Sequence, residues 1–588
     1  MRPGAPAEVP LPDVPRAPRI WKLREAEGWE QLVADRGVSP LIARLLASRR
    51  VTEPEDARLW LEGSLRDLPD PSTLLGMDQA TARVEAAIAG GELICVHGDY
   101  DVDGCTSVAL LVHFLRRLGA NVTWYAPHRQ RDGYGVADHT VRRLGEEGVA
   151  VLITCDTGVS AHSAIRLGNE RNIDTIVCDH HTPPEELPEA HAIINPRLDG
   201  ADGPFWDLAA IGVSFMLAIA LRARLRANGF FAERKEPDLR DYLDLVALGT
   251  VADLAPLRGV NRLLVSTGLK VLAARKRPGL AALLLASGVG EGDPMDASHL
   301  GFRLGPRINA SGRLAEAARS VELMLTEDAE EARTLADLLD GYNKKRQDLE
   351  RRTYAEALGQ IHSDDRFDER KGLVLWSEEW HSGVVGIVAS RLVHHVQRPT
   401  LVIAMKAGEG VGTGSGRAIY GVDLYSVLKR YEPLLERFGG HRAAAGLTIR
   451  EDKLPLLREA FAEEAFEDSD PSAWQGSLSI DAELELKQLD WPLYNEVQRL
   501  APFGIGNSQP LFMLKGAKAR RVKGLKKGGL RMEIHDDDGA RIDAVGFGLG
   551  VRAADIKGPV DLAFHLQENH WRGVTSLELR IRDLRAAE

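Results

Sequence analysis

The sequence lacks any apolar run that could cross a membrane, because no uninterrupted apolar stretch approaches the roughly 20 residues that a spanning helix requires. Its N-terminal stretch, MRPGAPAEVPLPDVPRAPRI, is rich in proline and has no apolar core of the kind found in secretion signals. We therefore expect no membrane association, and we expect residues 1–18 to form a disordered leader.

Cysteine is scarce, with single residues at positions 95, 105, 155 and 178. These residues form no CxxC pair, which argues against a zinc site built on cysteines. All four fall in one stretch of apparent α/β units, as expected for small buried residues of a cytoplasmic protein. No HExxH or GxSxG motif occurs in a suitable context, so zinc-protease and serine-hydrolase chemistry are not supported.

Positive charge is in deficit, with a formal net charge of −12. This balance argues against nonspecific coating of nucleic acid, although it does not decide the charge of a local groove. The segment Lys515–Arg531 reverses the trend, because it holds several lysines and arginines and no acid. This basic stripe is suited to tracking phosphates, and a solvated hairpin with a basic tip explains it equally well.

The length of 588 residues predicts several domains, and the hydrophobic pattern predicts their types. Short apolar runs at 93–96, 122–125, 149–154 and 173–178 alternate with helical segments at 107–118, 138–147 and 161–170. This alternation is typical of a mostly parallel, doubly wound sheet. A second α/β unit begins near residue 373, after a long charged helical stretch over 328–361. Short strands with glycine turns beyond residue 476 predict a small antiparallel barrel of the OB type.

We therefore expect an α/β protein in which two α/β domains are joined by a long helix and followed by a barrel. The expected division is a leader (1–18), an N-terminal helical segment (19–90), a catalytic α/β domain (91–326), a linker helix (327–362), a second α/β domain (363–470) and an OB-like domain (471–588).

Acids and histidines follow two of the predicted strands. The run His97-Gly98-Asp99-Tyr100-Asp101-Val102-Asp103-Gly104 comes directly after the first strand, and Cys178-Asp179-His180-His181 ends a later one. Ligands gather at the carboxyl ends of parallel strands, and clustered charges there are costly unless cations neutralise them. Carboxylate oxygens with neutral imidazoles suit Mn²⁺ or Mg²⁺.

Two further acids recur at comparable places. Asp156 ends the third apparent strand in Thr-Cys-Asp-Thr-Gly, and Asp253 follows a helical run in Gly-Thr-Val-Ala-Asp-Leu. A single strand-end aspartate is more often a helix cap, and a single histidine pair is more often a surface feature. Asp99 could cap its turn, and Asp179 could orient a histidine. The joint occurrence predicts a metal-dependent hydrolase.

In order, HGDYDVDG, TCDTG, CDHH and GTVADL resemble the motifs of the DHH phosphoesterase superfamily, and GGHRAAAG at 439–446 resembles the signature of its associated C-terminal domain. The segments LPDPSTLLGMDQA, PHRQRDGYGV and GPRINASGRL resemble the RecJ family of single-strand-specific exonucleases, and the likeness runs from about Trp21 to the end of the chain.

The resemblance implies roles at matching positions. One cation would be held by Asp103, Asp156, His180 and Asp253, and a second by His97, Asp101 and the shared Asp156. The two cations would be Mn²⁺ or Mg²⁺. His181 would face the scissile phosphate, and His441 would face the metal cleft as a further catalytic and nucleic-acid contact.

Several other residues suit nucleic-acid contacts. Arg307, Asn309 and Arg313 lie in a glycine-flanked segment without nearby acids in the sequence. Ser415 and Arg417 resemble a terminal-phosphate pocket, which Arg129 could complete. Alternatively, Arg129 is an ordinary surface arginine, and residues 415–417 form a plain strand turn.

The expected function is a 5′-to-3′ exonuclease that hydrolyses single-stranded DNA to 5′-mononucleotides with two cations, in DNA repair and recombination. The resemblance implies a monomer that works with a RecQ-type helicase and single-strand binding protein. The alternative enzyme is a DHH phosphodiesterase for oligoribonucleotides or dinucleotides, against which the terminal barrel argues. A non-catalytic binding scaffold is a third interpretation, against which the retained acids argue.

Overall fold

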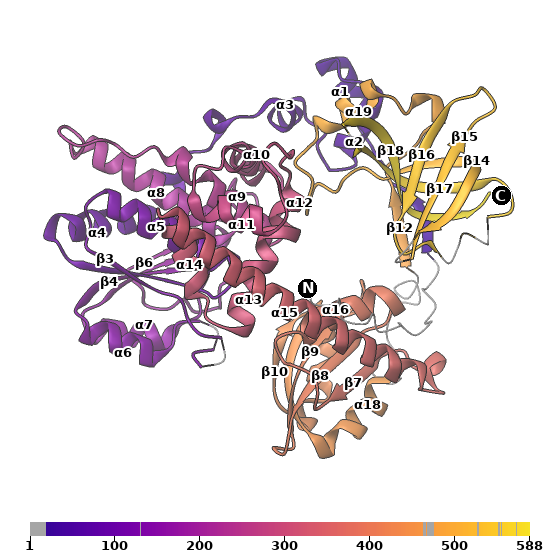
Figure 1. Cartoon of the computed structure of the whole chain (residues 1–588). Helices are drawn as coiled ribbons and strands as arrows, with labels where there is room; N and C mark the ends of the chain where they lie inside the picture. The colour runs from indigo at the N-terminus through magenta and orange to yellow at the C-terminus, as the bar shows by residue number, and fades with distance from the viewer. Residues whose placement is uncertain are drawn as a thin grey trace. The chain divides into compact units, whose positions relative to one another are not determined.

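The computed structural model describes residues 19–129, 131–133, 135–462, 466, 476–525, 528–550, 553, 556–571 and 573–587. The chain divides into two compact units (Figure 1). The larger unit comprises Leu23–Asp340 and Ser479–Glu588, and the smaller unit comprises Gly341–Leu478 with the residues before Leu23. The expected leader, and Lys526 and Lys527 of the basic stripe, lie outside the described residues. Within the described ranges, no helix has the length and apolar character needed to span a membrane.

A five-stranded sheet in the order β3-β2-β4-β5-β6 forms the first part of the larger unit. Its strands are β2 (Leu93–Gly98), β3 (Val122–Tyr125), β4 (Val149–Cys155), β5 (Asp174–Cys178) and β6 (Ala192–Ile194). Every neighbouring pair is parallel, so the predicted parallel sheet is confirmed. Gly98, Cys155 and Cys178 stand in register, which brings the residues after β2, β4 and β5 to the same edge.

Helices cover both faces of this sheet (Figure 1). One face carries α4 (Met77–Gly90), α5 (Val102–Arg117) and α8 (Ala210–Ala227), and the other carries α6 (Asp138–Glu146) and α7 (His162–Asn169). Helix α5 begins at Val102 instead of near Ser107, because the Asp101 carboxylate accepts hydrogen bonds from the N–H groups of Asp103 and Gly104. Asp103 therefore lies in the first turn of a buried helix.

The helical remainder of the larger unit follows the sheet. It comprises α9 (Leu243–Ala252), α10 (Gly259–Ala273), α11 (Pro278–Ala286), α12 (Ala297–His299), the π-helix η5 (Leu300–Leu304), α13 (Gly305–Leu314) and α14 (Ala318–Leu325). The glycine-flanked segment predicted to contact phosphates is thus helix α13. Helix α15 (Ala329–His362) begins in the larger unit and ends in the smaller one.

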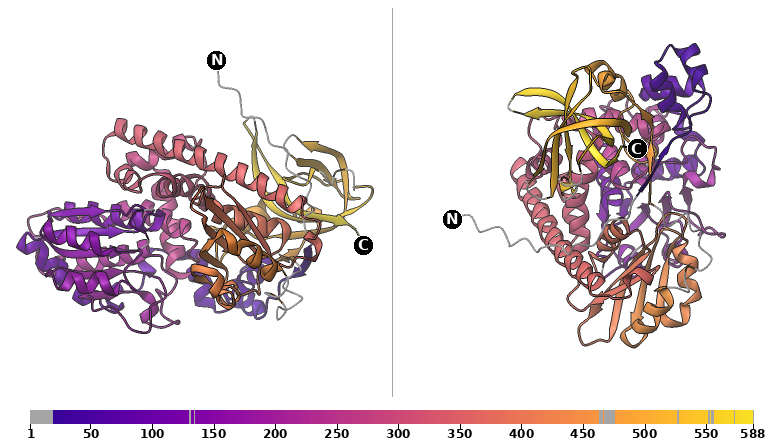
Figure 2. Two further views of the ribbon diagram at one scale, coloured as in Figure 1. Left: turned by 90° about the horizontal axis from the view of Figure 1, so that it is seen from below. Right: turned by 90° about the vertical axis from the view of Figure 1, so that its right-hand side faces the viewer.

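Six strands at the C-terminal end form a closed, curved sheet in the order β13-β14-β15-β16-β18-β17, with β14 also pairing with β17 (Figure 2). They are β13 (Ala482–Glu483), β14 (Phe512–Leu525), β15 (Gly529–His535), β16 (Arg541–Gly546), β17 (Val560–Trp571) and β18 (Val574–Ala586). The predicted barrel is confirmed, but two of its strand pairs, β13–β14 and β16–β18, are parallel instead of antiparallel. Strand β18 lies between β16 and β17, a placement set by barrel closure that the alternation of apolar residues does not encode.

The acids missing from the basic stripe come from neighbouring segments of the barrel. Lys515 pairs with Glu483 at 2.8 Å, Arg521 with Glu533 at 2.6 Å and Arg531 with Asp543 at 2.9 Å. Lys518 pairs with Asp537. These exposed pairs are individually weak, so they reduce the local positive charge without blocking access to it.

The smaller unit contains a mixed sheet in the order β10-β11-β9-β8-β7. Its elements are β7 (Leu373–Ser377), α16 (Val385–Val396), β8 (Thr400–Lys406), β9 (Val411–Arg417), α17 (Leu424–Arg430), β10 (Leu435–His441), β11 (Ala444–Arg450) and α18 (Leu454–Ala462). Only β7 and β8 are parallel. Segment Ser415–Arg417 ends strand β9, and GGHRAAAG forms the β10–β11 hairpin.

Within the larger unit, Arg262 joins helix α10 to the segment that precedes the barrel strands. Its side chain is buried and donates hydrogen bonds to the carbonyl oxygens of Trp60 (2.9 Å), Leu500 (2.8 Å) and Ala501 (2.7 Å). Its guanidinium also lies 4.8 Å from the Trp60 ring centroid. Burial, together with the charge of Arg49, lowers the pKa of Arg262 to about 10.

We expect Arg262→Met to destabilise the larger unit by about 3 kcal/mol, because three buried carbonyl groups would lose their donor. The free energy of unfolding in urea would measure the loss. Arg226→Met is the matched control, because Arg226 is exposed and pairs with Glu236, and its change should stay within about 0.5 kcal/mol. Equal effects of the two substitutions would contradict the role given to Arg262.

Candidate metal centre

Five aspartates and two histidines meet at the carboxyl edge of the parallel sheet. The His180 Nε2 atom lies 3.2 Å from an Asp156 carboxylate oxygen, 3.8 Å from one of Asp253 and 3.9 Å from one of Asp103. Asp103 and Asp156 are buried, and so is Asp99 nearby. The strand-end acids predicted from the sequence therefore come together in space.

Backbone groups hold two of these carboxylates in place. Both oxygens of Asp103 accept hydrogen bonds from the first turn of α8, one from Ala210 N–H and one from Ile211 N–H, each at 2.7 Å. Asp156 follows β4 with a φ of 62°, a left-handed conformation that aspartate tolerates better than most residues. Its own N–H donates to the carbonyl of Cys178 at 3.0 Å, which ties it to β5.

Asp179 orients the histidine pair. Its buried carboxylate accepts from the N–H groups of His180 (2.8 Å) and Val159 (3.0 Å), and from Nδ1 of His181 (2.7 Å). Burial lowers the pKa of His181, but the hydrogen bond and the charge of Asp179 outweigh it and raise that pKa overall. Burial lowers the pKa of His180, which favours a neutral imidazole.

The aspartates repel one another. Burial, together with the charge of Asp101, raises the pKa of Asp99 to about 8. Burial, followed by the charge of Asp253, raises the pKa of Asp103 to about 7, and burial with the charge of Asp101 raises the pKa of Asp253 to about 7. The pKa of Asp156 is raised well above its usual value for the same reasons. A cation would relieve this repulsion and restore the ionised carboxylates.

The orphaned atoms of the cluster fit divalent cations. Buried polar atoms without a hydrogen-bond partner include an oxygen of Asp99, an oxygen of Asp156 and Nε2 of His180. In the part of the chain that the structure describes, three ligand groups lie close enough to share an ion: Asp103–His180–Asp253, Asp156–His180–His181 and Asp99–Asp101–Asp156. Within each group the ligand atoms are within 4.8 Å of one another, and oxygens with imidazole suit Mn²⁺ or Mg²⁺.

His97 lies beside this cluster, outside the three ligand groups. It is fully buried, both of its ring nitrogens lack a hydrogen-bond partner, and burial lowers its pKa to about 4. Its ring lies 5.4 Å from the ring of Tyr125. Asp99, which ranks below the other acids on sequence grounds, occupies the place expected for His97 in the second ligand group. Asp99 could have been predicted as a ligand from the sequence, because it lies in the same short motif as Asp101 and Asp103.

The predicted nucleic-acid contacts of the larger unit have different surroundings. Arg129 is exposed, with its guanidinium 5.1 Å from the ring centroid of Tyr100, between Asp99 and Asp101 in the sequence. Arg307 forms an ion pair at 2.8 Å with Asp340, an acid that lies 33 positions further along the sequence. Asn309 and Arg313 are half-buried on α13. This helix lies close to the loop of Asp99, Tyr100 and Asp101 (the metal loop), because a Cβ on Gly312 would meet the carbonyl of Tyr100 at 2.5 Å.

In the smaller unit, Arg417 and Ser415 lie together at the end of β9. Arg417 Nη1 donates to Ser415 Oγ at 2.8 Å and to the carbonyl of Gly416 at 2.7 Å. Burial lowers the pKa of Arg417, and no acid contributes to that shift. A Cβ on Gly386, in the first turn of α16, would lie 3.2 Å from the Arg417 guanidinium. His441 is exposed at the end of β10.

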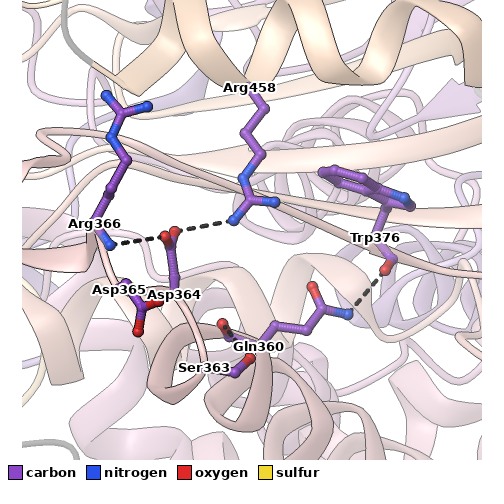
Figure 3. Close-up of a pocket in the computed structure, with 7 residues that line it drawn as sticks. All are labelled: Gln360, Ser363, Asp364, Asp365, Arg366, Trp376 and Arg458. Atoms are coloured by element: carbon purple, nitrogen blue, oxygen red, sulfur yellow. Dashed lines mark hydrogen bonds and ion pairs between the residues drawn. The ribbon is translucent and has the colours of Figure 1, made fainter.

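A cavity of 590 Å³ in the smaller unit lies where α15 ends, beside β7 and α18 (Figure 3). Within it, Asp364 accepts hydrogen bonds from Arg458 Nη2 at 2.9 Å and from the Arg366 N–H at 3.2 Å. None of the predicted site residues lines it.

Comparison with known proteins agrees with this geometry. The "DHH family, N-terminal domain" model matches residues 93–250, the "DHHA1 domain" model matches 369–467, and the "RecJ OB domain" model matches 480–583. The single-stranded-DNA-specific exonuclease RecJ of Salmonella typhimurium is 38% identical over 96% of this chain and 99% of its own length. This chain belongs to the RecJ family.

Three further RecJ comparisons cover nearly the whole of this chain. RecJ of Thermus thermophilus is 35% identical over 97% of this chain and 79% of its own length. The crystal structure of that protein in complex with Mn²⁺ matches with a TM-score of 0.80, at 33% identity, over 97% of this chain and 79% of that chain. A structure of the same protein in complex with Mg²⁺ matches with a TM-score of 0.74, at 32% identity, over 97% of this chain and 78% of that chain. The resemblance read from the motifs is confirmed.

We expect Asp156→Asn to stabilise the protein in EDTA while removing its response to Mn²⁺. Asparagine keeps the size and tolerates the left-handed φ, but it removes one of the repelling charges. Each kcal/mol gained should raise the thermal midpoint by about 2–4 °C.

The measurement is the thermal midpoint of both proteins with EDTA and with Mn²⁺. The wild-type midpoint should rise with Mn²⁺ through binding to the folded state, and the variant midpoint should not. Asp537→Asn, on the exposed barrel surface, should behave as wild type. A variant that keeps the full Mn²⁺ response would refute a ligand role for Asp156.

Proposed function

We propose that this chain is a metal-dependent exonuclease that hydrolyses single-stranded DNA from the 5′ end to 5′-mononucleotides. One observation carries the proposal: the buried carboxylate–histidine cluster lies in a chain that RecJ exonucleases match almost from end to end. The alternative, hydrolysis of dinucleotides or oligoribonucleotides, leaves the C-terminal barrel without a role. We also propose the domain division 19–90, 91–326, 327–362, 363–470 and 471–588, with a leader over 1–18.

Two divalent cations, Mn²⁺ or Mg²⁺, would be held by the aspartates and His180 of the cluster. When bound, they would lower the pKa of a water and stabilise charge on the phosphate oxygens. Asp103, Asp156, His180 and Asp253 suit one cation, and Asp101 and Asp156 suit the other together with Asp99 or His97.

The chain supplies the remaining chemistry through fixed donors. The Nδ1–H of His181 donates to Asp179, so a protonated ring presents its Nε2–H away from Asp179. That proton is suited to a non-bridging phosphate oxygen, where it would stabilise the developing negative charge. His441, from the smaller unit, is proposed to donate to the same phosphate.

The 5′ phosphate is proposed to bind at Arg417 and Ser415. Arg417 is held by Ser415 and by a backbone carbonyl, and no acid contributes to its pKa shift, so its charge is available to a phosphate. The first turn of α16 adjoins it, and helix N-termini favour anions. Arg129, Arg313 and Asn309 are proposed to contact the following phosphates, and Arg307 to help hold α13.

By resemblance to the RecJ family, we further propose that the protein acts as a cytoplasmic monomer in repair and recombination. A RecQ-type helicase would supply single strands, and single-strand binding protein would present them.

We expect Asp253→Asn to lower exonuclease activity by more than about 100-fold, because it removes a direct ligand of a cation. Asp253 is a suitable position, because its side chain is 24% exposed whereas Asp103 and Asp156 are buried. The assay is release of mononucleotides from 5′-labelled single- and double-stranded DNA with Mn²⁺, Mg²⁺ or EDTA. Turnover of dinucleotides with no digestion of long strands would favour the alternative function.

We expect Arg417→Ala to abolish the preference for 5′-phosphorylated over 5′-hydroxyl strands while activity on the hydroxyl ends remains. Arg417→Lys should restore part of that preference, because lysine keeps the charge but not the planar fork. The measurement is kcat/KM for each strand. An equal loss on both ends would make Arg417 a general backbone contact.

A further inference from the structure

Asp132 is the hydrogen-bonding centre of the loop between β3 and α6. Its side chain is only 1% exposed. One carboxylate oxygen accepts from the Tyr125 hydroxyl and from the His128 N–H, each at 2.7 Å. The other accepts from Arg131 Nε at 2.8 Å and lies 3.2 Å from Nε2 of His139. A single carboxylate thus ties together the strand, the turn and the following helix.

These bonds close a tight turn on which Arg129 is exposed. The N–H groups of Arg131 and Asp132 both donate to the carbonyl of His128, at 3.1 Å and 2.8 Å. Arg129 is exposed inside this turn, and its guanidinium lies 5.1 Å from the Tyr100 ring centroid. The position of Arg129 beside the metal loop therefore depends on the closure of the turn.

The Asp132 carboxylate also holds the ring of Tyr125, which lies beside His97 just before the metal loop. The Tyr125 hydroxyl donates to Asp132, while its ring lies 5.4 Å from the ring of His97. The guanidinium of Arg143 stands over the Tyr125 ring at 4.4 Å. The Tyr125 hydroxyl also accepts a hydrogen bond from Arg131 Nη2 at 3.3 Å, so the ring is held by Arg143 and its hydroxyl by two partners.

We propose that Asp132 is a positioning residue for the substrate: by closing the 128–132 turn, it holds Arg129 where a phosphate of the single strand passes the metal centre. This inference rests on the proposed function and deepens it, because it assigns the orientation of Arg129 to a residue that touches neither DNA nor cation. The observations favour Arg129 as the residue that contacts the phosphate, because its guanidinium lies over the Tyr100 ring, whereas Arg131 pairs with Asp132.

The test is the dissociation constant for a fluorescent, 5′-phosphorylated oligo(dT), measured by anisotropy in EDTA so that neither cleavage nor cation binding contributes. We expect Asp132→Asn to weaken binding by about 10-fold, close to the effect of Arg129→Ala, because one phosphate contact is lost in both. The double variant should bind no more weakly than Arg129→Ala alone. The slope of log Kd against log salt should fall by about one in each variant.

Three controls separate positioning from general damage. Asp138, the first residue of α6, contacts Ser163 of α7 through its carboxylate. Asp138→Asn removes this carboxylate and should leave DNA binding unchanged. Tyr125→Phe removes one donor to Asp132 and should give an intermediate loss with an unchanged fold, which keeps the test decisive if Asp132→Asn folds poorly. Asp132→Glu should recover part of the affinity, because it keeps the charge.

Each outcome decides the matter. Additive losses in the double variant, or wild-type affinity in both Asp132→Asn and Tyr125→Phe, would overturn the positioning role while leaving the exonuclease proposal intact. Failure of the wild-type chain to bind the oligonucleotide would overturn the proposed function together with this inference.

Discussion

Repulsion among buried carboxylates at one edge of the parallel sheet is the constraint on which the rest of the larger unit depends. Asp99, Asp103 and Asp156 are each at most 4% exposed, and the pKa of each is raised by burial and by neighbouring charge. Such a cluster costs stability unless cations offset its charge. A cluster of this kind at adjacent strand ends is expected for a cation site, because the protein is more stable with the cation bound than without it.

The surrounding fold opposes that repulsion by fixing individual atoms. Two N–H groups of α8 hold the Asp103 oxygens, the start of α5 holds Asp101, and the parallel register of β4 and β5 holds the backbone of Asp156. Charges fixed in this way do not have to reorganise when a phosphate enters, which is how a folded site stabilises a transition state better than water does. The rigidity of the first sheet is therefore part of the chemistry.

The sequence predicted the strand-end acids because buried strands and the acids that follow them are contiguous in the chain. It did not predict their partners, because those come from distant segments: the donors to Asp103 lie in α8, and the acid that pairs with Arg307 lies in α15. The start of α5 escaped prediction because Asp101 was interpreted as a ligand and not also as a cap.

Glycine and strand direction account for the other differences. Strands β9 and β10 carry glycines where apolar residues usually mark a strand, so the sequence left open a strand turn at 415–417, and these residues in fact end strand β9. In the barrel, alternation reports which face a residue occupies but not which way its strand runs, so the parallel β16–β18 pair was missed. The proposed role of Asp132 could not be predicted from the sequence, because it depends on hydrogen bonds that form only in the folded turn.

The partners of the basic residues separate two uses of positive charge in an acidic protein. Arg307, Lys515, Arg521 and Arg531 each face an acid, so a phosphate would have to compete with that acid. Arg417 is held by a hydroxyl and a carbonyl, and Arg129 lies over an aromatic ring, so both guanidinium groups are oriented without being neutralised. An arginine oriented by neutral groups keeps its full charge for a ligand, whereas an arginine oriented by an acid has its charge neutralised by that acid. A net charge of −12 is therefore compatible with binding a polyanion. Affinity depends on local groups, which here are the arginines held by neutral partners and the divalent ions that the acids attract.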